Sequence, residues 1–178
     1  MKIYKIILPI LFLTFISIYW FLESLPLEFN VSKNIIVNSN PEEVYLYLKN
    51  LNNWEKFNPV SSKDKETKYI YSFTNDTIGS SVVWNSETEG KGKVTLISIT
   101  KNKIVYSFNM VELNQNTIGT FLIESQKNKT KLTWNLFGKL ERNPISKLIG
   151  FFSENIFGYD MNISIIKIKS NMENKKFN

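Results

Sequence analysis

With 178 residues, 43% of them hydrophobic, the chain is long enough for one domain with a substantial core plus a small appendage, but short for two full domains. Histidine and cysteine are both absent, which excludes Cys/His nucleophile–base pairs, Ser-His-Asp triads and zinc sites of the usual Cys/His kind. The formal charge of +6 comes from scattered lysines, so we expect no nucleic-acid partner.

The first segment, residues 6–22, is almost wholly apolar and close to the shortest length that spans a bilayer. A cleaved signal peptide is the alternative interpretation. Small residues usually precede a cleavage site, but here the segment ends in the bulky run from Tyr19 to Leu22, which suits a membrane interface. We therefore predict a transmembrane anchor over residues 1–24 and a folded domain over residues 25–178.

The charges around this segment predict its orientation. Lys2 and Lys5 precede it, whereas Glu23 and Glu28 are the nearest charges after it. By the positive-inside rule the N-terminus stays in the cytoplasm. The sequence thus predicts a single-pass protein of the cell membrane with its domain on the periplasmic or extracytoplasmic side.

The domain begins with a strand followed by a helix. Apolar residues alternate with polar ones over residues 27–37, which is typical of a strand. Asn40 is a good N-cap and Pro41 suits the first helical position, because the N–H that proline lacks has no partner there. Val44 and Leu48 then recur at helical spacing.

Six short runs rich in β-forming residues follow, separated by short polar breaks. Consecutive strands joined by tight turns favour an antiparallel meander. We predict these strands at residues 68–73, 78–85, 91–100, 103–110, 116–125 and 129–138.

A second helix start, Asn143-Pro144, introduces a long helical pattern. Apolar residues recur there in steps of three and four, so we expect one continuous apolar face. Gly150 and Gly158 inside the pattern predict a close approach or a bend. The residues of the predicted face are Ile145, Leu148, Ile149, Phe152, Ile156, Tyr159, Ile163 and Ile166.

The order of these elements, with local markers at Val37–Pro59, Gly79–Trp84, Gly119–Phe121 and Lys129–Trp134, resembles the START-like, or SRPBCC, superfamily. The similarity is to its membrane-anchored, polyketide cyclase/dehydrase-related branch, and it covers about residues 26–169. It implies an α+β helix-grip fold, in which a seven-stranded curved antiparallel sheet wraps around a long C-terminal helix.

A sheet that curves around a helix without closing on it leaves a space between them, and the residues that line this space decide function. The alternative for each candidate is ordinary core packing. Strand parity and the aromatic residues near the helices give nine candidates for lining a pocket: Trp54, Phe57, Trp84, Tyr106, Phe108, Phe121, Trp134, Phe152 and Ile156.

Three functions remain open. The first is binding of a lipid or other hydrophobic small molecule, without a cofactor or metal. The second is a cyclase or dehydratase kind of enzyme, which the resemblance suggests and which needs an acid or base in the pocket. The third is a protein-interaction module, as in a branch of the superfamily that activates a heat-shock chaperone. We assign no catalytic residue; the carboxylates within or beside predicted elements are Glu87, Glu89, Glu112, Glu124 and Asp160.

Overall fold

The computed structural model describes residues 3–110 and 117–174. Its seven strands form one antiparallel sheet in the order β1-β7-β6-β5-β4-β3-β2, so the predicted six-strand meander is confirmed and the first strand pairs with the last. The strands are β1 (Glu28–Val37), β2 (Lys68–Tyr71), β3 (Ser81–Ser86), β4 (Gly90–Thr100), β5 (Lys103–Met110), β6 (Thr117–Gln126) and β7 (Lys129–Lys139).

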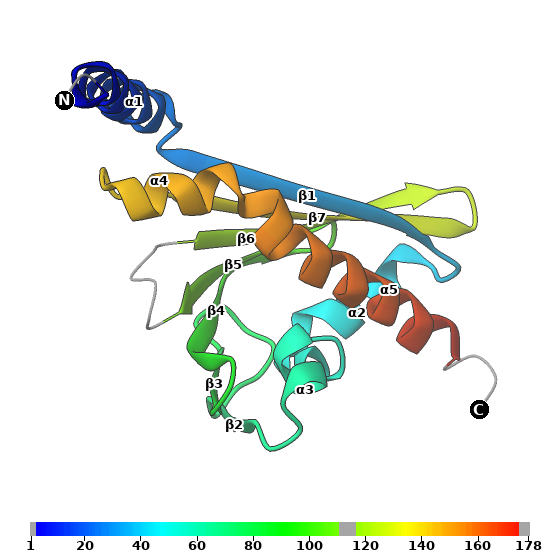
Figure 1. Ribbon diagram of the computed structural model, residues 1–178. Coiled ribbons are helices and arrows are strands. Elements are labelled where there is room, and N and C mark those ends of the chain that lie inside the picture. Colours follow the sequence, from blue (N-terminus) through cyan, green and yellow to red (C-terminus); the bar gives the residue numbers. More distant parts are fainter. Residues whose placement is uncertain (1–2, 111–116, 175–178) are drawn as a thin grey trace.

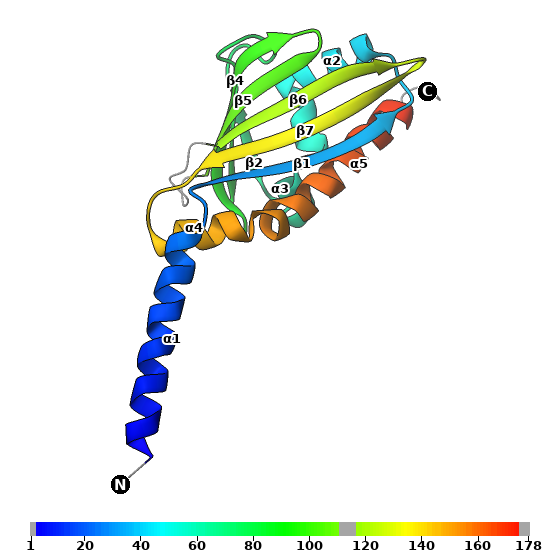
Figure 2. The same ribbon diagram turned by 90° about the horizontal axis from the view of Figure 1, so that it is seen from above.

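The helices lie against one face of this curved sheet (Figure 1). Three short helices connect β1 to β2, and the C-terminal helices run across the sheet beside β1, as the second view also shows (Figure 2). This is the predicted helix-grip arrangement. The helices of the domain are α2 (Pro41–Lys49), η1 (Leu51–Lys56), α3 (Pro59–Lys63), α4 (Pro144–Phe151), η2 (Glu154–Gly158) and α5 (Tyr159–Asn174).

The predicted helix starts are confirmed by their hydrogen bonds. The side chain of Asn40 accepts a hydrogen bond from the backbone N–H of Glu43 at 2.9 Å. Asn143 caps α4 in the same way, accepting from the N–H of Ser146 at 2.8 Å. Each cap satisfies one of the backbone donors that a helix start leaves unpaired.

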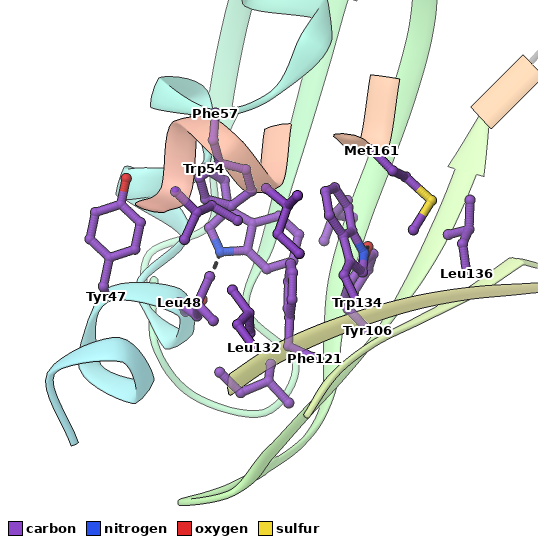
Figure 3. Packing of buried hydrophobic residues seen from close by; sticks show 14 of the residues in the cluster. Tyr47, Leu48, Trp54, Phe57, Tyr106, Phe121, Leu132, Trp134, Leu136 and Met161 are labelled. Atoms are coloured by element: carbon purple, nitrogen blue, oxygen red, sulfur yellow. Dashed lines mark hydrogen bonds between the residues drawn. The ribbon is translucent and has the colours of Figure 1, made fainter. Parts of the chain in front are cut away.

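The core fills the space between the sheet and the helices. Phe121 and Leu132 on the strands and Val44 and Leu48 on α2 are fully buried there. Trp54 of η1 lies among them, and its indole nitrogen donates to the carbonyl of Leu48 at 2.7 Å (Figure 3). This bond fixes η1 against α2 and aims a large aromatic ring at the sheet.

The C-terminal helix differs from its prediction in two ways. It is interrupted by η2, a π-type turn that ends at Gly158, which confirms the expected bend. The predicted apolar face is wrong: Ile145, Leu148, Phe152, Ile156, Tyr159 and Ile166 are exposed, and Ile149 and Ile163 are only half-buried.

Small residues and one lysine are buried in place of the predicted apolar ones. The buried positions of α4 and the two residues after it are Ser146, Lys147, Gly150 and Ser153. A Cβ on Gly150 would lie 2.3 Å from a methyl carbon of Leu140, so α4 closely approaches the residue that follows β7. In α5 the buried residues are Met161, Ser164, Ile165, Ile168 and Met172.

The helix α1 (Tyr4–Ser24) extends away from the domain, and its C-terminal end lies beside α4 (Figure 2). Within residues 3–110 and 117–174 it is the one helix long and apolar enough to cross a membrane. The whole helix stands outside the domain core. Its single internal proline, Pro9, lies in the half distant from the domain.

Candidate functional site

A cavity of about 660 Å³ opens between the sheet and the helices. Its walls come from η1 and α3, from the turn between β3 and β4, from the inner face of four strands, and from η2 with the start of α5. The volume falls within the range of roughly 300–1,000 Å³ typical of small-molecule sites. Apolar side chains supply most of the lining, as such sites require.

The structure brings seven of the nine predicted pocket residues to this cavity: Trp54, Phe57, Trp84, Tyr106, Phe108, Trp134 and Ile156. Phe121 is instead fully buried behind the wall, with its ring centroid 5.0 Å from that of Trp134. Phe152 lies on the exposed side of the C-terminal helices and packs against Phe151.

Two aromatic residues of the cavity wall, on β5 and β7, form a hydrogen bond across the strand β6 that lies between them. Trp134 donates its indole N–H to the hydroxyl of Tyr106 at 2.7 Å. Figure 3 shows the two side chains together, between the Trp54–Phe57 pair and the side chains of Met161 and Leu136. Burial raises the pKa of Tyr106, so its hydroxyl stays protonated. In the described part of the chain no acceptor takes that proton, which leaves a donor for a bound molecule.

Two glycines position the aromatic rings of the wall. Gly119 lies opposite Tyr106 in the β5–β6 register, and a Cβ there would come within 1.9 Å of the Tyr106 ring. Gly92 lies opposite Trp84 in the β3–β4 register, and its Cβ would come within 2.0 Å of the indole. Each ring therefore lies flat over a strand position where only glycine leaves room.

Lys63 joins two sides of the cavity mouth. Its ammonium group donates to Asp160 on α5 at 2.9 Å and to Glu89 in the β3–β4 turn at 3.2 Å. The hydrogen bond to Asp160, more than that to Glu89, raises the pKa of Lys63. The sequence analysis missed this residue, because nothing in the spacing of residues 63, 89 and 160 indicates that they meet.

A second contact near the cavity mouth is made by Asp64, the residue after Lys63. Its carboxylate accepts from the hydroxyl of Ser86 at 2.6 Å, and from the backbone N–H groups of Glu66 at 2.9 Å and Glu87 at 3.2 Å. These bonds, that of Ser86 first, lower the pKa of Asp64. The β3–β4 turn is thereby tied to the end of α3.

The carboxylates noted in the sequence separate into three groups. Glu87, Glu89 and Asp160 line the cavity near its mouth. Glu124 is exposed on β6 and pairs with Lys131 at 3.1 Å. Glu112 lies outside the described residues. Within the described ranges, histidine, cysteine and carboxylate side chains form no group that could hold a metal ion.

No protein-family model and no curated protein matches the sequence. Solved structures, in contrast, match most of the chain. The di-domain ARO/CYC protein StfQ of the steffimycin biosynthetic pathway superposes with a TM-score of 0.66 at 11% identity, over 85% of this chain and 53% of that one. The chain has the helix-grip fold of START-like proteins.

Two further neighbours show the range of proteins built on this fold. Norcoclaurine synthase from Thalictrum flavum, in complex with dopamine and hydroxybenzaldehyde, gives a TM-score of 0.64 at 8% identity, covering 86% of this chain and 90% of that one. The Aha1 dimer from Colwellia psychrerythraea gives 0.56 at 16% identity, covering 81% and 96%. At these identities the likeness establishes the fold alone.

Proposed function

We propose that the protein is a membrane-anchored binder of a lipid or other hydrophobic small molecule, which it holds in the cavity between the sheet and the C-terminal helices. The observation that carries this proposal is the cavity of about 660 Å³ lined by Trp54, Trp84, Tyr106 and Trp134. Binding of an apolar ligand in an apolar space of this size is favourable, because the ligand displaces water from apolar surface.

The lining also favours a particular kind of ligand. Most of the wall offers apolar contact, but two lining residues also have buried donors: the hydroxyl of Tyr106 and the indole N–H of Trp84, which has no hydrogen-bond partner among the described residues. A ligand with a long apolar body and a small polar end that accepts hydrogen bonds suits such a wall, since an unpaired buried donor is costly. Fatty acids and related lipids have this composition.

The enzyme alternative has weaker support. An acid–base reaction needs a titratable group free to exchange protons inside the pocket. Asp160 and Glu89 are both paired with Lys63 at the mouth, Glu87 is exposed to solvent, and the Tyr106 hydroxyl is kept protonated by burial. The arrangement suits holding a ligand better than transforming it.

The membrane part of the proposal depends on α1. Its length and composition match a bilayer span, and its aromatic end, Tyr19 to Phe21, matches the membrane interface. With Lys2 and Lys5 before it, we infer a cytoplasmic N-terminus and an extracytoplasmic domain. Fusing reporters to the C-terminus tests the orientation: alkaline phosphatase should be active and green fluorescent protein dark, and the reverse pattern would overturn it.

Mass spectrometry and probe displacement test the ligand. The full chain, purified in mild detergent, should carry a co-purified lipid, and a fluorescent fatty acid should bind and be displaced by unlabelled fatty acid. Leu136→Trp, which puts a larger side chain into the cavity, should weaken probe binding. Leu122→Trp is the matched control, because Leu122 lies on the opposite face of the neighbouring strand. Absence of both lipid and displaceable probe, or equal binding by the two variants, contradicts the proposal.

A further inference from the structure

An apolar stripe runs along the outer side of α4 and η2. It consists of Ile145, Leu148, Phe151, Phe152 and Ile156, which are between 37% and 73% exposed. In a helix packed only against its own domain such residues face inward. Here the buried positions of α4 hold Ser146, Lys147 and Gly150, so the amphipathic helix leaves its apolar side exposed. An exposed apolar patch of this kind marks an interaction surface.

The stripe lies at the domain end of α1. The ring of Phe21 in α1 packs edge-on against that of Phe151, with 5.8 Å between their centroids. Figures 1 and 2 show that α4 crosses the end of α1, on the side of the domain from which α1 leaves. Trp20, an interface-type residue, precedes the end of α1 at Ser24 by about 6 Å at the helical rise of 1.5 Å per residue.

Ion pairs fix α1 to α4. Glu23 accepts from Arg142 at 2.5 Å and from Lys147 at 2.8 Å, and Lys147 also donates to the backbone carbonyl of Glu23 at 3.3 Å. The Lys147 side chain is buried in this joint. Glu23, Arg142 and Lys147 each have a partner of opposite charge, which lowers the cost of placing these groups near lipid.

The other end of the stripe reaches the cavity. Ile156 is exposed as part of the stripe and also lines the cavity, as does the neighbouring Phe157. The acidic residues nearby are paired as well, Glu154 with Lys33 and Asp160 with Lys63. A continuous apolar path therefore leads from the packing site of α1 to the cavity mouth.

We propose that the exposed stripe of α4 and η2 lies in the surface of the bilayer that holds α1, and that the ligand moves between bilayer and cavity along it. The occupant of the stripe is the lipid interface, because α1 packs against this face at the point where the span ends. The second half of this inference rests on the proposed function, whereas the first half does not.

Site-specific labelling tests the contact with lipid. The chain contains no cysteine, so Leu148→Cys, Phe152→Cys and Ile97→Cys each give one attachment site for the polarity-sensitive dye NBD. Ile97 is the matched control, because at 44% it is about as exposed as Phe152 at 48% but lies on β4, outside the stripe. In full-length protein in phosphatidylcholine nanodiscs, dye at positions 148 and 152 should emit at shorter wavelength and be quenched by headgroup-region nitroxide lipids. Spectra equal to that of position 97 would overturn the proposal.

A second measurement separates this inference from the proposed function. Leu148→Asp with Phe152→Asp should slow transfer of a fluorescent fatty acid from nanodisc lipid to the cavity, while leaving unchanged its binding in detergent solution. Unchanged transfer overturns the path along the stripe. If the unaltered chain does not bind the fluorescent fatty acid in detergent solution, the proposed function is overturned, whatever the NBD labels report.

Discussion

Trp134 and Tyr106 form a buried hydrogen bond of 2.7 Å in the cavity wall, the indole donating and the phenol accepting. The acceptor is itself a donor, since the phenol keeps its proton. Tyr106 thus accepts the hydrogen bond of Trp134 and keeps a hydroxyl proton that a ligand can accept. The stability of the wall and the affinity for a ligand should therefore respond to the same substitution in separable ways.

Tyr106→Phe should destabilise the protein by about 1–3 kcal/mol, because it leaves the buried Trp134 indole without an acceptor. Urea unfolding measures this loss. In the Trp134→Phe background the same substitution should cost much less, since the bond is already absent. Equal costs in the two backgrounds would mean that the bond contributes nothing.

The same variant tests the ligand chemistry. Tyr106→Phe should weaken binding of a fatty acid by about 5- to 30-fold, equivalent to about 1–2 kcal/mol, since a buried hydrogen bond is lost. Binding of a hydrocarbon of equal length should change little. Displacement titrations with both ligands check this, and a parallel loss for both would point to damage of the wall.

Gly119→Ala should displace the Tyr106 ring, because the new methyl group would come within 1.9 Å of it. Overpacking of this kind costs roughly 1–3 kcal/mol. The ring has free space only on its cavity side, so probe affinity should fall together with the unfolding midpoint. Thr120→Ala is the control, since Thr120 lies on the opposite face of the same strand. A wild-type midpoint for Gly119→Ala contradicts the close packing.

Much of the fold follows from local signals that need no tertiary context. Asn40 and Asn143 mark helix starts through hydrogen bonds within four residues, and hairpin breaks divide the strands. Strand parity likewise puts Tyr106 and Phe108 on one face of their strand and Trp134 with Leu136 on one face of theirs, and all four line the cavity. These features are short-range, so the sequence contains them directly.

The incorrect predictions concern which side of the C-terminal helices is buried. The spacing of Ile145, Leu148 and Phe152 does not tell whether that side of the helix is buried, and the buried residues are Ser146, Gly150 and Ser153 instead. Small residues on a helix carry no periodic hydrophobic signal, although they permit the closest approach. The π-type turn then shifts the phase, so α5 buries Ile165 and Ile168 rather than Ile166.

Lys63→Met should open the cavity mouth, because Asp160 and Glu89 lose the group that joins them. Ligand exchange should accelerate, whereas the unfolding midpoint should hardly change, since exposed ion pairs contribute about 0–1 kcal/mol. Stopped-flow displacement measures the exchange. Lys131→Met is the matched control: its side chain is 43% exposed against 42% for Lys63, and its partner Glu124 lies away from the cavity. Equal rates for the two variants would show that the ion pairs do not gate the mouth.

Asp64→Asn should destabilise the protein at neutral pH but not in strong acid. Hydrogen bonds from Ser86 and from two backbone N–H groups lower the folded-state pKa of Asp64. A carboxyl with a lowered folded pKa stabilises the fold above its unfolded pKa of about 4, and that stability is lost as the pH falls through the folded pKa. The difference in melting temperature between wild type and Asp64→Asn should therefore be constant above about pH 5 and shrink below pH 4.

Ser86→Ala separates the hydroxyl bond from the rest of this effect. Ser86 gives the shortest hydrogen bond to Asp64 and the largest contribution to its lowered pKa. In the Ser86→Ala background, the acid-dependent part of the Asp64→Asn effect should be smaller than in wild type, because the carboxylate has lost its best donor. Melting curves from pH 3 to pH 7 for the four proteins measure this. If the effect of Asp64→Asn on the melting temperature does not vary with pH, the charge of the carboxylate does not stabilise the contact between α3 and the β3–β4 turn. The shape of the asparagine side chain would then account for the loss.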